Sequence, residues 1–434
     1  MSLSPPARKA LVAAGSLACV AALLVGVGHW RASDLMTGDV AWHTAVDGNE
    51  GEAIVVRDRI YTYDDDRLTI RDLRTGKVLA EERQEGHRAY VGDGGHVATV
   101  GLRQIAMTDR NGTLVWQEAV DDLYDPIAIS LDGELDAIDC SDDGCVTVHL
   151  DATGRETSRT PRLSPDHATP ATIGYATFDD TRMQRVPTIP TDIDQRTHSI
   201  QQLRDGKPLG APIGLLDDHT AAQVGDLLVG LSRENDTCTF TATRAGVPAW
   251  TTTTPCPDLG FPEVEVFADR IYVTNPTDTA YDIVTSDLDG RRASSFRIDV
   301  GPTAESDRRQ LSATPEAVVL VSTDRVSGYS PTTGKRRWTE KLRRTSHDVL
   351  EKSTKIYPGI DVTGPVVDRY GNAAQPFTNL AFGREVPSWT HTFLDAGSGE
   401  ESARLAAPYG SVAHGLEDGS VLVVGSDDMW LVSP

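Results

Sequence analysis

Short segments in which hydrophobic and polar residues alternate follow one another along most of the chain after Asp34. In the segment RLTIRDL (67–73), Leu68 and Ile70 share one face, and the polar residues beside them share the other. A period of two is typical of a strand, whose successive side chains point to opposite faces. Helical periodicity is almost lacking in this stretch. The pattern therefore predicts an all-β domain of many short strands.

A turn signal recurs between these segments. It is a polar residue, often Asp, followed within about four residues by Gly. The signal occurs in DLRTG (72–76), DRNG (109–112), DATG (151–154), RDG (204–206), RAG (244–246), DLDG (287–290), SPTTG (330–334) and DAGSG (395–399). Glycine supplies positive φ, and Asp or Asn bonds its own backbone, which is the chemistry of a hairpin turn. Strand-only repeats of this kind indicate a propeller or a solenoid.

A tryptophan stands four residues after a glycine of this kind in four units. These residues are Trp42, Trp116, Trp250 and Trp338, which follow Gly38, Gly112, Gly246 and Gly334. Four of the seven tryptophans in the chain share this offset, which scattered placement would not produce. We therefore interpret the four tryptophans as structural residues that define the repeat.

The two ends of the chain indicate how the repeat closes. Residues 38–46 resemble the last strand of a unit, and residues 411–434 resemble the first three strands. Pairing of the two pieces would complete one unit and remove the open edge that a solenoid must cap. We therefore predict one closed β-propeller over residues 38–434, with about eight four-stranded blades within a range of seven to nine.

The repeat resembles the pyrroloquinoline-quinone-type propeller repeat. The segments that carry the resemblance are LTIRDLRTGKVL (68–79), IAMTDRNGTLVWQ (105–117) and YSPTTGKRRW (329–338), and IYVTN (271–275) is similar to the related YVTN-type repeat. Members of this family include quinoprotein dehydrogenases and the cofactor-free propeller lipoprotein of the outer-membrane assembly machinery. The quinone enzymes are expected to carry adjacent cysteines, and this chain has no Cys-Cys pair. The resemblance therefore implies a membrane-anchored propeller without a cofactor.

An uncharged segment of nineteen residues, Ala10–Gly28, precedes the strand-rich part. As a helix it would span about 28 Å, close to the hydrocarbon thickness of a bilayer. Arg8 and Lys9 precede the segment, and this charge placement favours an N-terminus inside the cytoplasm. We expect a cytoplasmic N-terminus at 1–9, a transmembrane signal anchor at 10–30, a linker at 31–37 and an extracytoplasmic propeller.

Two processed forms fit the N-terminal segment less well than an anchor. A cleaved signal peptide would have an A-x-A-like cleavage site, which is not clear after Gly28. A lipoprotein would have Leu three residues before Cys19, where Ser16 stands.

The other four cysteines fall into local pairs, Cys140 with Cys145 and Cys238 with Cys256. An even number outside a reducing compartment indicates disulfides, and the CxxC spacing of a zinc site is absent.

Composition and motifs limit the possible chemistry. The chain has 64 acidic and 41 basic residues, a net charge of −23, which disfavours nucleic acid as a partner. Neither HExxH nor G-x-S-x-G occurs. His149 and His391 lie in strand patterns, where we interpret them as structural. We assign no catalytic, metal-binding or cofactor-binding residue.

Two irregular regions are candidates for binding. The segment 357–377 lies in the widest gap between turn signals, where it forms either a binding loop or a decorated blade. The basic run KRRWTEKLRR (335–344) is either a docking patch for an anionic partner or a solvated edge strand.

These features favour a membrane-anchored, extracytoplasmic module that binds a protein or peptide partner in the bacterial cell envelope. The alternative is a propeller enzyme, a hydrolase or lyase rather than a quinoprotein dehydrogenase, with its site at the mouth of the central channel. A cluster of histidine and carboxylate side chains at one mouth would favour the enzyme. An exposed apolar patch on a rim would favour the binding module.

Overall fold

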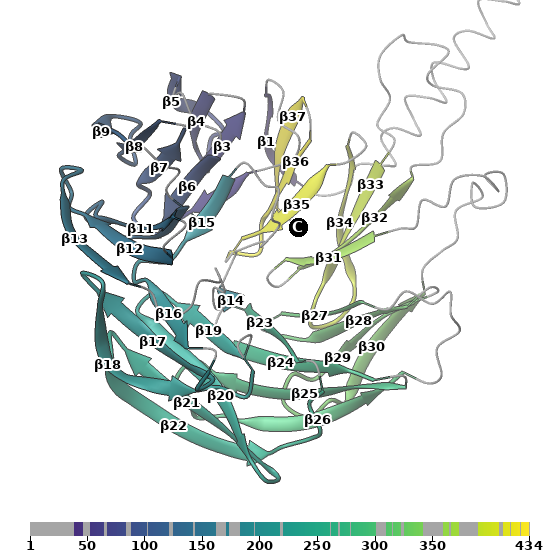
Figure 1. Ribbon diagram of the computed structural model, residues 1–434. Helices are drawn as coiled ribbons and strands as arrows, with labels where there is room; N and C mark the ends of the chain where they lie inside the picture. Colours follow the sequence, from purple (N-terminus) through teal and green to yellow (C-terminus); the bar gives the residue numbers. More distant parts are fainter. Residues whose placement is uncertain are drawn as a thin grey trace, which may run out of the picture.

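The structure, a computed structural model, is an all-β propeller with eight four-stranded blades and one further sheet of three strands (Figure 1). It describes residues 39–46, 53–64, 67–83, 88–101, 103–120, 125–141, 144–161, 171–172, 183–194, 196–217, 220–260, 262–267, 270–277, 279–300, 310–314, 316–322, 325–341, 359–363, 366–372, 389–407, 411–416, 418–425 and 427–433. The predicted all-β propeller and its predicted number of about eight blades are confirmed.

The first four sheets follow the chain from its first complete unit. They contain β2 (Ile54–Val56), β3 (Arg59–Asp64), β4 (Arg67–Asp72) and β5 (Val78–Arg83); β6 (Arg88–Gly92), β7 (Val97–Val100), β8 (Gln104–Thr108) and β9 (Leu114–Ala119); β10 (Asp125–Ile129), β11 (Leu135–Ser141), β12 (Gly144–Leu150) and β13 (Glu156–Pro161); and β16 (Thr191–Asp194), β17 (Ser199–Arg204) and β18 (Lys207–Gly214).

The next four sheets continue the ring in the same way. They contain β19 (Ala221–Val224), β20 (Leu227–Glu234), β21 (Thr237–Arg244) and β22 (Val247–Pro255); β23 (Glu263–Phe267), β24 (Arg270–Pro276), β25 (Ala280–Asp287) and β26 (Ser294–Asp299); β27 (Gln310–Ala313), β28 (Val318–Ser322), β29 (Arg325–Tyr329) and β30 (Arg336–Lys341); and β31 (Gly359–Thr363), β32 (Val366–Asn372), β33 (Trp389–Asp395) and β34 (Glu401–Ala407).

The last sheet joins the two ends of the chain. Its strands are β35 (Val412–Gly415), β36 (Val421–Val424), β37 (Asp428–Ser433) and β1 (Asp39–Ala45). β1 pairs antiparallel with β37, with Asp39 opposite Ser433. The strand at the start of the described chain therefore completes a blade that the C-terminal strands begin, and the ring closes without an open sheet face.

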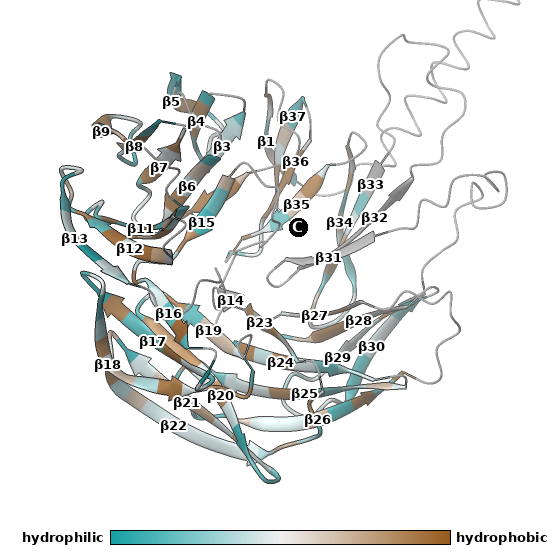
Figure 2. Ribbon diagram, in the orientation of Figure 1, coloured by the Kyte–Doolittle hydropathy of each residue, from teal (hydrophilic) through white to brown (hydrophobic). Residues whose placement is uncertain are grey.

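Within each four-stranded blade the first strand lies nearest the centre of the ring and the fourth lies at the rim (Figure 1). The alternation seen in the sequence places one side of each strand against the adjacent blade, and Leu68 and Ile70 are buried as that pattern predicts. In Figure 2, β36 is hydrophobic whereas the rim strand β22 is mostly pale. The core therefore lies between blades rather than at one centre.

One of the nine sheets departs from the repeat. The sheet β16–β18 has three strands, and β15 (Met183–Val186), which precedes it, pairs in parallel with β6 of another blade. Arg185 donates from Nε and Nη2 to Asp93 Oδ1, at 3.0 and 2.8 Å. Met183 and Val186 are buried there. This strand is held on β6 by its own ladder, buried side chains and an ion pair.

A second parallel strand, β14 (Ala171–Thr172), pairs with β19. Like β6, β19 is the first strand of its blade, so both added strands lie on the channel side of the ring (Figure 1). β14 and β15, which are consecutive strands in the sequence, therefore lie beside the channel at two different blades.

At eight of the nine junctions between neighbouring sheets, a rim side chain packs against a turn glycine of the next blade. The contacts pair Trp42 with Gly76, Ala80 with Gly112, Trp116 with Gly154, Thr160 with Gly206, Leu209 with Gly246, Trp250 with Gly290, Phe296 with Gly334 and Trp338 with Gly399. A Cβ atom on Gly290 would lie 2.5 Å from Trp250 Cδ2, and Gly290 has a φ of +72°. Only glycine fits both the contact and the backbone at this turn.

Three of the four docked tryptophans also donate a hydrogen bond across the contact. Trp42 Nε1 donates to Leu73 O at 2.9 Å, Trp250 to Leu288 O at 3.0 Å and Trp338 to Ala396 O at 2.8 Å. The indole Nε1 of Trp116 is buried and has no hydrogen-bond partner among the described residues. A register shift precedes each of these tryptophans in its strand.

Buried tyrosines form a second set of contacts between blades. Tyr61 on β3 donates to Gly95 O, and Tyr272 on β24 donates to Thr314 O, both at 3.2 Å. Burial raises the pKa of Tyr61 to about 12. The hydroxyl of Tyr61 therefore remains a hydrogen-bond donor at any physiological pH.

Both predicted disulfides are present. Cys140 and Cys145 join β11 to β12, and Cys238 on β21 is joined to Cys256, just after β22. Each bond stays within one blade, so the disulfides hold hairpins together and leave the contacts between blades to the side chains described above.

The predicted N-terminal segments 1–9, 10–30 and 31–37 lie outside the described residues. Over the part of the chain that is described, no helix is long and apolar enough to cross a membrane.

The two kinds of docked tryptophan predict different costs of substitution. Trp250→Phe removes a donor that is bonded, whereas Trp116→Phe removes a buried donor that is not. Because a net hydrogen bond contributes about 1 kcal/mol and an unpaired buried donor is itself costly, we expect Trp250→Phe to be more destabilising by about 1–2 kcal/mol. Urea denaturation of the two variants measures the difference, and equal losses of stability would contradict the hydrogen-bond account.

Candidate binding pocket on the rim

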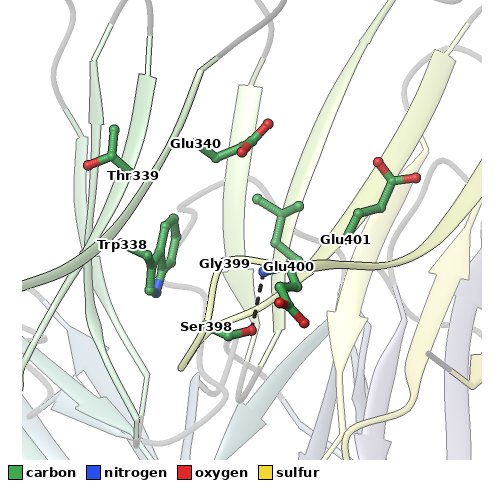
Figure 3. Close-up of a pocket in the computed structure, with 8 residues that line it drawn as sticks. Trp338, Thr339, Glu340, Ser398, Gly399, Glu400 and Glu401 are labelled. Carbon is green, nitrogen blue, oxygen red and sulfur yellow. Dashed lines mark hydrogen bonds between the residues drawn. The ribbon is translucent and has the colours of Figure 1, made fainter.

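A pocket of about 340 Å³ opens at the rim between β30 and the turn that leads into β34 (Figure 3). Its walls come from two neighbouring blades. The lining residues are Trp338, Thr339, Glu340, Leu394, Ser398, Gly399, Glu400 and Glu401. The pocket therefore exists only because adjacent units of the repeat meet.

The contact between Trp338 and Gly399 forms one side of this pocket. A Cβ on Gly399 would lie 2.5 Å from Trp338 Cδ2, so the turn backbone lies directly against the indole. Trp338 Nε1 is bonded to Ala396 O, which fixes the ring. Leu394 is buried beneath. These contacts place a rigid aromatic side chain beside the acidic residues of the turn.

The pocket carries negative charge. Glu401 Oε2 accepts a hydrogen bond from Arg404 Nη2 at 2.7 Å, which offsets part of its charge. Glu340 and Glu400 form no ion pair with any described residue. Ser398 Oγ accepts from the Glu400 backbone N–H at 3.2 Å, which orders the turn (Figure 3). Gly328 and Gly399 both pack on the indole of Trp338, so the carboxylates rather than the ring would attract a cationic group, through charge.

Sequence reasoning identified one of these residues and missed the others. Trp338 was predicted as a repeat residue, whereas Glu340, Ser398 and Glu400 were not singled out. The available signal was the repeat itself, because docking of Trp338 on the following turn brings GSGEE (397–401) beside WTE (338–340). Trp42, Trp116 and Trp250 lie at three other contacts between blades.

The two irregular regions of the sequence behave differently from one another. Lys335, Arg336 and Arg337 are exposed just before Trp338 and do not line the pocket, and Arg337 Nη1 donates to Glu316 O at 2.7 Å. The segment 357–377 contains β31 and β32, the first two strands of an ordinary blade. The long gap between turn signals at 357–377 therefore includes regular strands.

The two histidines that we interpret as structural are both buried and hydrogen-bonded. His391 Nε2 lies 2.7 Å from Ser411 Oγ, and its ring stacks on Phe393. His149 Nδ1 lies 3.1 Å from Asp136 Oδ1. In the described part of the chain, no group of three or more His, Cys, Asp or Glu side chains could hold a metal ion.

Exposed apolar side chains gather on the rim of three neighbouring blades. They are Val40, Val78, Leu79, Leu114 and Val115, which are 38–50% exposed. An apolar patch at the rim is the feature expected of a binding module.

A polar contact joins β12 to the three-stranded sheet. His149 Nδ1 lies 3.1 Å from Asp136 Oδ1 in its own blade, and Nε2 lies 3.5 Å from Asp205 Oδ1 in the turn between β17 and β18. The hydrogen bond to Asp136 is the main cause that raises the pKa of His149 above its ordinary value, and the charges of Asp205 and Glu134 add to it, whereas burial opposes it. When protonated, the ring bridges two blades whose other contacts also include polar groups, since Ser158 Oγ donates to Asp205 O at 3.1 Å.

This bridge predicts a pH dependence of stability. Because the folded-state pKa of His149 is raised, its contribution is complete below the unfolded pKa of about 6.5 and is lost as pH rises through the higher folded value. We expect the melting temperature of the wild type to fall relative to that of His149→Gln as pH is raised from 6 to 9. Thermal melts across this range check it, and parallel profiles for the two proteins would refute the bridge.

Comparison with known proteins adds resemblance in structure only. No protein-family model and no curated protein matches the chain. The structure of BamB from Moraxella catarrhalis is similar at 13% identity and a TM-score of 0.43, covering 92% of this chain and 100% of that one. The WD40 domain of SCAP from fission yeast is similar at 9% identity and a TM-score of 0.44, covering 92% and 98%. At this similarity we transfer no function from either protein.

Proposed function

We propose that the protein is a membrane-anchored binding and scaffolding module of the cell envelope. The observation that carries this proposal is the acidic pocket on the rim, where Trp338 lies beside Glu340 and Glu400. The repeat resemblance to cofactor-free propellers of the pyrroloquinoline-quinone type is consistent with it. In this account the segment 10–30 anchors the chain, and the ring stands outside the cytoplasm.

The partner of the pocket is a protein or peptide segment that presents a cationic side chain. Glu340 and Glu400 come from different blades, so a Lys or Arg side chain that enters the pocket would meet negative charge from both walls. Charge-assisted hydrogen bonds to carboxylates are about twice as strong as neutral ones. The pocket is thus a specific point of attachment on a ring that otherwise supplies rigid support.

Register shifts disfavour strand addition as the binding mode at the rim. In β5, β9 and β30 a shift interrupts the ladder just before the docked residue. A bulged edge strand is a poor template for another strand. We therefore expect side chains rather than backbone pairing to hold the partner.

A peptide titration tests the pocket. The probe is a fluorescent, acetylated peptide with one arginine in a Gly-Ser sequence, and the variant is Glu340→Gln/Glu400→Gln. Loss of two carboxylates that line the pocket should weaken binding by about tenfold, because each tenfold step corresponds to only about 1.4 kcal/mol. Fluorescence anisotropy measures the dissociation constant.

The matched control is Glu82→Gln/Glu118→Gln, which removes the same charge from exposed positions on β5 and β9. It should change the dissociation constant by less than about twofold, as distant surface charges are screened by salt. Equal weakening by both double variants would mean that only net charge attracts the peptide, and the pocket would then not be the site.

A further inference from the structure

The five exposed apolar residues of the rim occupy one position of the repeat. Val78 and Leu79 begin two residues after Gly76, and Leu114 and Val115 begin two residues after Gly112. Val40 stands at the same distance from Gly38 in the sequence. We name this set the apolar arc. Each of its five side chains is at least 38% exposed in the ring as described.

The apolar arc spans three successive blades. Trp42 docks on Gly76, so β1 lies beside the turn that begins β5, and Ala80 docks on Gly112, so β5 lies beside the turn that begins β9. At the same position the residues are charged on β13, β30 and β34, where Glu156, Arg336 and Glu401 stand. On β18 and β22 the residue is Pro208 or Pro248, and the exposed Val247 stands one residue earlier.

All three blades present the arc on one face of the ring. Leu73 N donates to Asp58 O at 3.0 Å, which joins the turn before β5 to the turn between β2 and β3. Arg110 Nη2 lies 3.3 Å from Asp58 Oδ1, which brings the turn before β9 to the same place. The strands of the arc start from this common turn face.

Exposed cations accompany the arc. Arg57, Arg74 and Lys77 lie in or next to these turns, are exposed and form no ion pair with a described residue. Among the acidic side chains of this region, Asp58 and Asp72 lie 2.7 and 3.6 Å from Arg59 Nη1, Asp109 accepts hydrogen bonds from the backbone of its own turn, and Asp39 is exposed beside Val40. In a chain of net charge −23, exposed cations and apolar side chains therefore lie together here.

The chain enters the ring at the arc. Asp39, the first residue of β1, stands next to Val40, and only ten residues (29–38) separate it from the uncharged segment Ala10–Gly28. Ten extended residues reach at most about 35 Å. If the uncharged segment spans the membrane, as proposed above, the tether emerges from the bilayer within that reach of the arc.

We infer that the apolar arc lies against the anionic surface of the membrane that anchors the chain, with Arg57, Arg74 and Lys77 facing lipid phosphates. Valine and leucine side chains enter the boundary between head groups and acyl chains, and cations beside them gain from the negative surface potential. This contact holds the ring on one edge and leaves the opposite face free. It rests on the proposed anchor and is independent of the proposed rim pocket.

Depth-dependent quenching tests this orientation. The full chain with Cys19→Ser is placed in vesicles of three parts phosphatidylcholine to one part phosphatidylglycerol, and a fluorophore is attached at Val115→Cys. The matched control is Arg103→Cys, at the other end of the same blade between β7 and β8. We expect quenching by doxyl-labelled lipid to be at least about threefold greater at 115 than at 103, since only the arc would contact lipid.

Each other outcome identifies a different failure. Equal quenching at both sites in protein that floats with the vesicles overturns the inference and leaves the anchor intact, whereas failure to float overturns the anchor. A label at 115 that is shielded from iodide but not quenched by lipid shows a protein cover, such as a second copy, and also overturns it. Replacing phosphatidylglycerol by phosphatidylcholine should halve the quenching or more, and unchanged quenching would contradict the role of the cations.

Discussion

The contact between a rim side chain and a turn glycine of the next blade is the constraint on which this ring depends. A four-stranded blade has two apolar faces and cannot bury both alone, so it is stable only between neighbours. The positive-φ glycine lets the turn approach an indole closely, as Gly290 approaches Trp250. The distance and orientation between blades are therefore set at the rim, and the tyrosine contacts fix them again nearer the centre.

The same contact explains the features on which function is proposed. Trp338, which follows a register shift in β30, packs on Gly399 and also lines the acidic pocket between the two blades. The equivalent shift in β9 turns both Leu114 and Val115 outward. Where no tryptophan docks, at Gly206, the contact is polar and His149 supplies a charged bridge. The repeat thus gives the blades a common framework, and residues that differ between blades at its exposed positions form the binding sites proposed here.

Much of this architecture could be predicted, because its determinants are local. Alternation places Leu68 in the core, and short spacings bring Cys140 and Cys145 together on one hairpin. The pairing of β15 with β6 of another blade could not be predicted, because it depends on an ion pair between Arg185 and Asp93, which lie far apart in the sequence. The pocket was missed for a similar reason, since its carboxylates meet only after two repeat units have docked.

Stability of glycine variants tests the rim contact most directly. Gly225→Ala is the reference, because Gly225 has a φ of +57° but nothing within 4 Å of an added Cβ, and it should cost about 1–2 kcal/mol for backbone strain alone. Gly290→Ala adds a clash with Trp250, so its cost in free energy of unfolding should be greater by about 1–3 kcal/mol. Urea denaturation measures both variants. Equal costs would contradict the claim that close packing on the turn glycine holds the blades together.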